Sequence, residues 1–348
     1  MLPKNDVRLL QFGLGPIGLE ILEKSRKLHQ LNIIGAVDID PEKVGKDVGD
    51  LIGTGKLGFQ VVSDLNDLSL PQQENGRKVA IHATGSNLEK VWPQIRELLD
   101  YGFSVVSTCE ELAYPWHRYP NLSKEIDYYA KSKGQSVLGT GINPGFIMDT
   151  LTICFTSVTN EVNNIKVVRK VDVSKRRIPL QKKVGVGMTR EEFNQLASQN
   201  SIGHVGLEES AQLIAYGLGV SLGKVYNTIN PVIAEEDIHL PIGQLTKGEV
   251  SGQHQVVKAI TTDGRNITLE LIMAVGVEQE DRITLEGQEP VELVIPNGIF
   301  GDTATAAMAI NTAKIVGMGN VSGLLTMADI NVPRNLQLAN NNFVPFQS

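Results

Sequence analysis

The stretch QFGLGPIG at Gln11–Gly18 decides the fold of this chain. Its three glycines fit the pattern G-x-G-x-x-G between an apolar run at Val7–Phe12 and a helical pattern at Leu19–Leu28. In this pattern the first glycine permits a tight turn, the second lets backbone approach a pyrophosphate, and the third lets the helix pack on the strand. The helix start also directs free N–H groups at the phosphates. The stretch therefore predicts a dinucleotide site, formed by Gly13, Gly15, Pro16, Ile17 and Gly18.

An acidic residue lies where a dinucleotide site needs one. Asp38 lies near the end of the apolar run Asn32–Ile39, 20 residues after Gly18. At this spacing a carboxylate accepts a hydrogen bond from the cofactor ribose. A carboxylate repels the 2′-phosphate of NADP, so Asp38 favours NAD(H), while Lys43 and Lys46 keep NADP(H) open as an alternative.

Length and composition bound the class of protein. At 348 residues, with 41% apolar and 20% charged residues, the chain is too long for one ordinary core and has a globular composition. It has no apolar run of roughly 18 residues and no signal-peptide pattern at Met1–Val7. Its two cysteines, Cys109 and Cys154, are too few for a disulfide framework or a closed zinc site. We expect a cytoplasmic protein without a metal.

The charge of the chain indicates which classes of molecule it can bind. The net charge is −7, and no dense basic block with interleaved aromatic residues occurs. Both features argue against nucleic acid as a main partner. The expected partners are therefore small molecules, and neither a nucleic acid nor a membrane is predicted.

Strand and helix patterns alternate over the first 150 residues. Short apolar runs rich in β-branched residues recur between amphipathic segments such as Leu88–Tyr101 and Leu122–Lys133. This alternation predicts an α/β fold, a doubly wound parallel Rossmann sheet with right-handed crossovers. The predicted strands are Val7–Phe12, Asn32–Ile39, Val79–Thr84, Phe103–Thr108 and Ser136–Gly141.

The pattern changes after about Thr150. Helices are predicted at Met148–Val158, Thr189–Gln199 and Leu207–Leu218, and the Asp-Gly pair in TTDGRN predicts a hairpin between two long strands. We expect an NAD(P)-binding domain at 1–150 and an α+β substrate and oligomerisation domain at 151–300, with a mostly antiparallel sheet. A helix at about 301–330 is expected to pack back on the first domain. The further predicted strands are Asn164–Val173, Val225–Ala234, Val250–Thr262, Asn266–Val277 and Glu289–Ile295.

Residues that directly follow strands are the candidates for ligand contact, because ligands bind beyond the carboxyl ends of open α/β sheets. In HATGSN at His82–Asn87, the small residues Thr84 and Gly85 are predicted to let the cofactor approach backbone. His82 is interpreted as a polar residue satisfied near the sheet end rather than as a catalytic acid. In GTGINPGF, Asn143 is predicted to hydrogen-bond the cofactor carboxamide or the substrate.

Two adjacent glutamates follow the strand at Phe103–Thr108. A carboxylate there would lie near the nicotinamide, where partial burial suits a general base. One of Glu110 and Glu111 is predicted to be functional and the other to be an ordinary residue of a first helical turn. Cys109 is interpreted as a buried structural thiol, because no base partner is visible for a nucleophile.

Several further residues are candidates for substrate contact. Aromatic side chains are predicted to line the pocket, and the basic loop SKRRIPLQKK at Ser174–Lys183 is a candidate for binding a substrate carboxylate. The alternative for that loop is a solvated surface. The candidates are Tyr114, Trp116, Phe146, Arg176, Arg177 and His204.

Six segments of the chain occur in the same order in a known family, and they cover residues from about 7 to 330. On these segments the chain resembles the 2,4-diaminopentanoate dehydrogenase-like proteins, a group that includes native amine dehydrogenases and shares the fold of dihydrodipicolinate reductase. The segments are the glycine loop, GAVDIDPEKVGKDVG at Gly35–Gly49, STCEELAYPW at Ser107–Trp116, GTGINPGF at Gly139–Phe146, GHVGLEES at Gly203–Ser210 and GDTATAAM at Gly301–Met308.

The resemblance implies NAD(P)-dependent oxidative deamination of an amine or diamino acid to a ketone and ammonia, with reductive amination in reverse. It implies a catalytic glutamate at Glu110, where related homoserine dehydrogenases carry a lysine, with Glu111 as the fallback. VDVSKRRIPLQ stands where dihydrodipicolinate reductase carries its substrate signature, which weakens that assignment. A homodimer is expected. The alternatives are another NAD(P)-dependent reductase of this fold and a non-catalytic NAD(P)-binding protein.

Overall fold

The computed structural model describes residues 7–28, 31–68, 76–240 and 243–335. They form two compact units. The first comprises the described residues up to Gly145 and from Gly301 onward, and the second is Phe146–Phe300.

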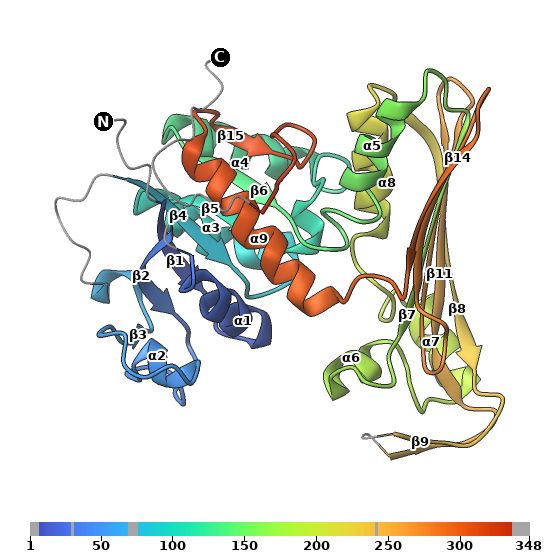
Figure 1. The fold of residues 1–348 in the computed structure, drawn as a ribbon, viewed down its shortest axis with the longest axis horizontal. Helices are drawn as coiled ribbons and strands as arrows, with labels where there is room; N and C mark the ends of the chain where they lie inside the picture. The colour runs from blue at the N-terminus through green and yellow to red at the C-terminus, as the bar shows by residue number, and fades with distance from the viewer. Residues whose placement is uncertain (1–6, 29–30, 69–75, 241–242, 336–348) are drawn as a thin grey trace. The chain divides into compact units, whose positions relative to one another are not determined.

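The first unit is built on a seven-stranded parallel sheet in the order β15-β6-β5-β4-β1-β2-β3 (Figure 1). Apart from β15, this is the strand order of dinucleotide-binding sheets, with its switch point between β1 and β4. The predicted doubly wound parallel sheet is confirmed. Its strands are β1 Val7–Phe12, β2 Leu31–Val37, β3 Val61–Val62, β4 Arg77–His82, β5 Ser104–Ser107, β6 Ser136–Gly139 and β15 Gly323–Leu325.

Helices cover both faces of this sheet. Helices α1 (Pro16–Ser25) and α9 (Gly301–Met318) lie against each other on one face, and α3 (Leu88–Asp100) and α4 (Pro120–Ser132) cover the other. Short helices α2 (Val48–Leu51) and η1 (Leu65–Asp67) complete the unit. The buried side of α3 repeats at helical spacing and packs with the strands into one core; its residues are Leu88, Val91, Trp92, Ile95, Leu98 and Leu99.

The second unit is built on a six-stranded sheet in the order β14-β13-β7-β12-β11-β8. Every neighbouring pair is antiparallel except β7 with β12, so the predicted mostly antiparallel sheet is confirmed. The Asp-Gly turn joins β11 to β12 as predicted. The strands are β7 Asn164–Asp172, β8 Leu222–Ile233, β11 Val250–Thr261, β12 Asn266–Ala274, β13 Glu280–Glu286 and β14 Val291–Pro296, beside the small pair β9 Ile238–Leu240 and β10 Gly243–Leu245.

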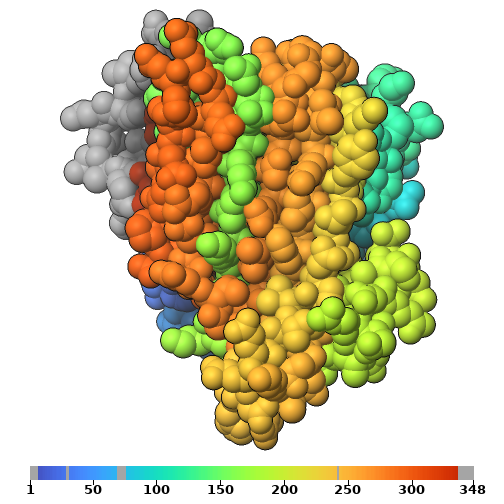
Figure 2. Space-filling view, turned by 90° about the vertical axis from the view of Figure 1, so that its right-hand side faces the viewer, coloured from blue at the N-terminus to red at the C-terminus, as the bar shows by residue number. Residues whose placement is uncertain are grey.

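Among the described residues, helices pack against only one face of the six-stranded sheet. Helix α8 (Leu207–Gly217) lies against β8, β11 and β12, and α5 (Thr150–Phe155) packs on α8. Helix α7 (Arg190–Ser198) lies against β8. Figure 2 looks onto the opposite face, where the strands themselves form the surface. In β11 the side chains alternate accordingly, with Val257 buried and Ile260 39% exposed.

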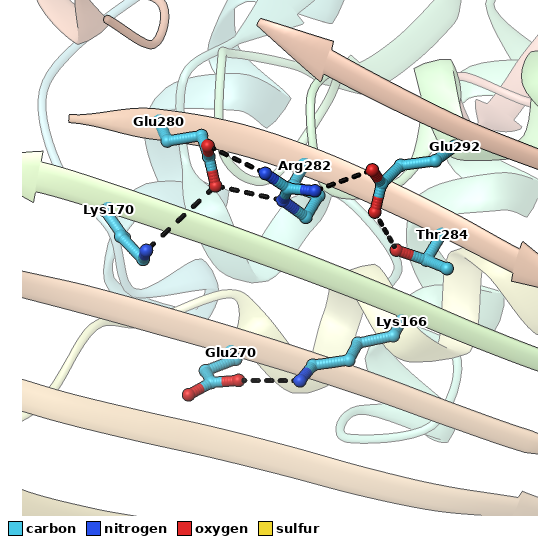
Figure 3. A network of polar contacts seen from close by, with 7 residues as sticks. All are labelled: Lys166, Lys170, Glu270, Glu280, Arg282, Thr284 and Glu292. Atoms are coloured by element: carbon cyan, nitrogen blue, oxygen red, sulfur yellow. Dashed lines mark hydrogen bonds and ion pairs between the residues drawn. The ribbon is translucent and has the colours of Figure 1, made fainter. Parts of the chain in front are cut away.

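The outward face carries a network of charged pairs (Figure 3). Arg282 donates to Glu280 at 3.0 Å and to Glu292 at 2.6 Å. Lys166 lies 3.6 Å from Glu270, and Lys170 lies 4.0 Å from Glu280. The Arg282–Glu280 pair lies within β13, and the other pairs join neighbouring strands on one side of the sheet.

The observed secondary structure differs from the prediction in two places. The segment Ser174–Lys183 is not a loop throughout, because α6 (Ile178–Lys183) begins after Arg177 with Pro179 in its first turn. The strand β13 was not expected from the sequence. Among the described residues, none of the helices is long and apolar enough to cross a membrane.

Candidate active site

The glycine loop lies at the switch point of the parallel sheet. Gly13 has a φ of +91°, and a Cβ there would lie 2.6 Å from Ala83 O. A Cβ on Gly18 would lie 2.0 Å from Gly13 O, so α1 packs directly on the loop. A Cβ on Gly15 would meet nothing within 4 Å, which leaves open space beside the N-terminus of α1. Pro16 and Ile17 open that helix. The loop therefore fits a pyrophosphate held by free backbone N–H groups.

Asp38 directly follows β2 and touches the glycine loop. Its carboxylate accepts from Leu14 N at 2.5 Å and from Asp40 N at 2.8 Å. Lys43 Nζ lies 2.9 Å from Asp40 and 3.7 Å from Asp38, so its charge is compensated, and Asp40 raises the pKa of Lys43. The neighbouring Ile39 is an apolar side chain that is 85% exposed, and no role was predicted for it.

The loop after β4 faces the glycine loop across the switch point. Thr84 and Gly85 are exposed there. The Thr84 hydroxyl donates to Gln94 Oε1 of α3 at 2.7 Å. His82, just before them, is fully buried, and burial lowers its pKa to about 4. This histidine is hydrogen-bonded within the protein, in agreement with its interpretation as a satisfied polar residue.

The two glutamates after β5 lie in a short 3₁₀ helix, η2 (Glu110–Leu112), but their surroundings differ. Glu111 is 7% exposed, and its Oε2 accepts from Leu88 N at 2.7 Å, Tyr119 Oη at 2.8 Å and Asn87 Nδ2 at 3.1 Å. The Glu110 carboxylate is half-buried and has no hydrogen bond or ion pair within the described part of the chain. One carboxylate is thus engaged in the fold, and its neighbour is available to a ligand.

The 3₁₀ helix is also tied to the loop after β4 through Cys109. Burial raises the pKa of this thiol to about 12, and its Sγ donates to Ser86 O at 3.1 Å. A protonated, buried thiol is no nucleophile. Cys109 therefore contributes packing and a weak hydrogen bond.

The turn after β6 presents unused polar atoms. Asn143 Oδ1 and Thr140 Oγ1 are buried and have no hydrogen-bond partner in the described ranges. Ile142 N donates to Thr305 Oγ1 of α9 at 3.4 Å. The Asn143 oxygen can accept from an amide or amine donor, whereas a buried acceptor without one costs about 1–3 kcal/mol.

The aromatic candidates after η2 lie in the first unit. Trp116 packs partly against the core under α3 and α4. Tyr114 is half-buried, and burial with the nearby charge of Asp329 raises its pKa.

The remaining candidates lie in the second unit. Phe146 is half-buried. The Arg176 guanidinium stacks over Phe300 at 4.3 Å, and Arg177 is exposed at the start of α6. His204 Nδ1 is buried without a partner in the described residues, and burial with the charges of Lys183 and Arg169 lowers its pKa to about 3. The ring is therefore neutral at neutral pH.

Within the described residues, no group of three or more His, Cys, Asp or Glu side chains could hold a metal ion.

The chain is similar to known proteins over almost its whole length. A family model described as the 2,4-diaminopentanoate dehydrogenase C-terminal domain matches residues 146–344. The 2,4-diaminopentanoate dehydrogenase of Acetoanaerobium sticklandii is 31% identical over 339 residues, covering 94% of each chain. A 4-hydroxy-tetrahydrodipicolinate reductase of Rippkaea orientalis is 32% identical over 89 residues, which cover 25% of this chain and 32% of the reductase.

A solved structure of an amine dehydrogenase from Mycobacterium smegmatis has a similar fold. Its TM-score is 0.83 at 23% identity, covering 95% of this chain and 98% of that one. At this identity the likeness bears on the fold alone.

Proposed function

The chain belongs to the 2,4-diaminopentanoate dehydrogenase family and is an NAD(P)-dependent oxidoreductase that acts on CH–NH₂ donors, and from this premise we propose that Glu110 is its general base. The reaction is the reversible oxidative deamination of an amine or diamino acid to a ketone and ammonia. The assignment rests on a contrast between the two glutamates. The carboxylate of Glu110 has no hydrogen-bond or ion-pair partner in the described residues, whereas the carboxylate of Glu111 accepts three hydrogen bonds.

The chemistry needs such a carboxylate. An ammonium group holds no lone pair to drive departure of the Cα hydride, so a base must first take its proton. Glu110 attracts the cation and accepts that proton. Once the proton has passed on to solvent, the carboxylate accepts a second proton from the water that attacks the resulting iminium. General-base help of this kind contributes about 10²–10⁴-fold. The bound nicotinamide supplies the hydride acceptor.

The residues at the strand ends fit a dinucleotide. Open space at Gly15 and the tight turn at Gly13 support pyrophosphate binding by the loop Gly13–Gly18. Asp38 is proposed to accept from the adenosine ribose, with exposed Ile39 against the base. Because Lys43 is paired with Asp40 and Asp38, we favour NAD over NADP. Thr84, Gly85 and Asn143 are proposed for the nicotinamide end.

Further residues are proposed for substrate contact. Tyr114 and Trp116, and separately Phe146, are proposed to supply apolar surface. Arg176, Arg177 and His204 are proposed for a substrate carboxylate, supported by the charge of the two arginines and the unpartnered His204 Nδ1. Arg176→Ala is then expected to raise KM for amino acids more than for simple amines.

A homodimer is proposed through the outward face of the six-stranded sheet. Six strands spaced about 4.8 Å apart and about nine residues long span roughly 850 Å², and a stable interface takes about 800 Å² per partner. The charges of Lys166, Lys170 and Arg282 are offset by Glu270, Glu280 and Glu292 on the same face. The chain as a whole has a net charge of −7, so this near-neutral face is the part of the surface on which a second copy of the chain would be repelled least.

A cytoplasmic location is proposed because both cysteines are free.

The activity is tested with a panel of amines, amino acids and 2,4-diamino acids, each with NAD⁺ and NADP⁺, read at the nicotinamide absorbance. We expect amine-dependent reduction and, in reverse, ketone-dependent oxidation of the reduced cofactor that requires ammonia. Cofactor binding without turnover on any member of the panel would favour a binding protein. Ammonia-independent turnover with an imine would favour a reductase of another kind.

A further inference from the structure

His82 occupies the centre of the switch point, although it touches no surface. By register it lies between Phe12 of β1 and Ser107 of β5, and its ring stacks on Phe12 at 5.5 Å between centroids. Both ring nitrogens have protein partners. Nδ1 lies 2.9 Å from Ser107 Oγ, and Nε2 lies 2.8 Å from Gln94 Oε1 and 2.9 Å from Thr84 Oγ1.

These partners fix one tautomer. The buried ring is neutral at neutral pH and therefore carries one N–H. Gln94 Oε1 can only accept, so the proton is on Nε2 and Nδ1 is the acceptor. Ser107 must then donate its hydroxyl proton to Nδ1, which leaves its oxygen free to accept. That oxygen accepts from Cys109 N at 3.1 Å.

The chain of hydrogen bonds ends beside Glu110. Cys109 is the N-cap of η2, and Glu110 is the first residue of that helix. At the other end, Thr84 belongs to the loop proposed for the cofactor. His82 thus joins the cofactor side of the site to the backbone that carries the proposed base, with every link within hydrogen-bond distance.

We propose that His82 is a positioning residue, which acts through Ser107 to set the place of the Glu110 carboxylate relative to the loop Thr84–Gly85. It does not transfer protons itself, since both nitrogens are bonded inside the protein. This inference rests on the proposed role of Glu110. Misplacement of a reacting group by about 1 Å costs about 10²-fold in rate, so loss of the link is expected to lower kcat.

Two serines of β5 provide a matched test. Ser107→Ala removes the hydroxyl that accepts from Cys109 N, and Ser104→Ala removes a hydroxyl that accepts from Ser136 N at 3.2 Å at the opposite end of the strand. Each variant loses one hydrogen bond to a backbone N–H, and Ser107→Ala also loses the link to His82 Nδ1. We expect Ser107→Ala to lower kcat at saturating cofactor and amine by about 10- to 100-fold, with the dissociation constant for NADH changed less than about twofold. Ser104→Ala should keep kcat.

Two replacements of His82 separate its two links. In His82→Asn the short amide oxygen can take the place of Nδ1 and accept from Ser107, whereas in His82→Gln the longer amide reaches toward Gln94 and loses the Ser107 link. We expect His82→Asn to keep more kcat than His82→Gln when both are measured well below their melting temperatures.

The outcomes separate the inference from the proposed function. Unchanged kcat in Ser107→Ala, an equal loss in Ser104→Ala, or a more active His82→Gln would overturn the positioning role. Glu110→Ala is assayed beside them. If it retains turnover, the proposed base is wrong; if it is inactive while Ser107→Ala is fully active, the positioning inference alone fails.

Discussion

Glu111 accepts a hydrogen bond from the backbone N–H of Leu88 at 2.7 Å, and this contact separates the roles of two neighbouring glutamates. Glu111→Ala leaves that N–H and the Tyr119 hydroxyl without their acceptor, so we expect a loss of about 1–3 kcal/mol in unfolding free energy. Glu110→Ala removes no side-chain hydrogen bond or ion pair among the described residues. It should leave the melting temperature unchanged, keep NADH binding and lower kcat by about 10²–10⁴-fold.

The Glu110→Ala and Glu111→Ala variants are compared by thermal unfolding, NADH fluorescence titration and amine-dependent turnover. Near-normal turnover in Glu110→Ala would contradict its role as base. A folded, stable Glu111→Ala enzyme with a large loss in kcat would instead move the base to the fallback position.

Alanine substitutions at two glycines of the loop are expected to have different effects, one on cofactor binding and the other on stability. Gly15 has a φ of −62° and open space where a Cβ would lie, so Gly15→Ala should fold normally and weaken dinucleotide binding by blocking close approach of the pyrophosphate. In Gly18→Ala the Cβ would lie 2.0 Å from Gly13 O, so we expect a loss of stability of about 1–3 kcal/mol or more. Cofactor titration and denaturant unfolding of both variants test this. Unimpaired NADH binding by Gly15→Ala would place the pyrophosphate elsewhere.

The parallel sheet was predictable because its strands are apolar on both faces. The run Val7–Phe12 is observed with the predicted bounds, and the glycine pattern located the switch point. The strand Glu280–Glu286 escaped prediction because its outward positions are charged. Their partners, such as Glu292 for Arg282, lie on a neighbouring strand and become visible only in the folded sheet.

The sequence predicted which residues of the candidate site follow each strand, but not how those residues are arranged around one another. The sequence places Glu110 and Glu111 after the strand β5, but it cannot distinguish them. What separates them is the N-terminus of α3 at Leu88, which lies 23 residues away in the chain. The positions of Ser107 and Gln94 around His82 also depend on the register of β4 with β5 and on the packing of α3.

Acid should destabilise the protein through His82. Its pKa is about 4 in the folded chain against 6.5 for an ordinary histidine. Above pH 6.5 the ring is neutral in both states; as pH falls below that value, the unfolded chain gains a proton and the folded chain does not until about pH 4. Between pH 7 and pH 5 this lowers the unfolding free energy by about 2 kcal/mol.

This effect is isolated by measuring the unfolding free energy with denaturant at pH 7 and at pH 5. The change between the two pH values is then compared between the wild type and His82→Asn. We expect the change to be smaller in the variant by the contribution of His82. An identical change in both proteins would mean that His82 titrates normally in the folded state.

The homodimer proposed through the outward face of the six-stranded sheet should be sensitive to a charge placed on that face. Ile260 is 39% exposed on that face near the end of β11, and two copies of it would be buried in a symmetric dimer that covers the face. Ile260→Asp would take a carboxylate on each side out of water, at a cost that its register partner Lys224 of β8 offsets only in part, so the dimer dissociation constant should rise by about 10- to 100-fold. Val158→Asp is the control, because Val158 is 65% exposed in the same unit but lies in the short helix η3 (Thr156–Val158), outside the sheet. Sedimentation over a range of protein concentrations distinguishes the two variants. A monomeric wild type, or equal dissociation of both variants, would show that copies of the chain do not associate through this face.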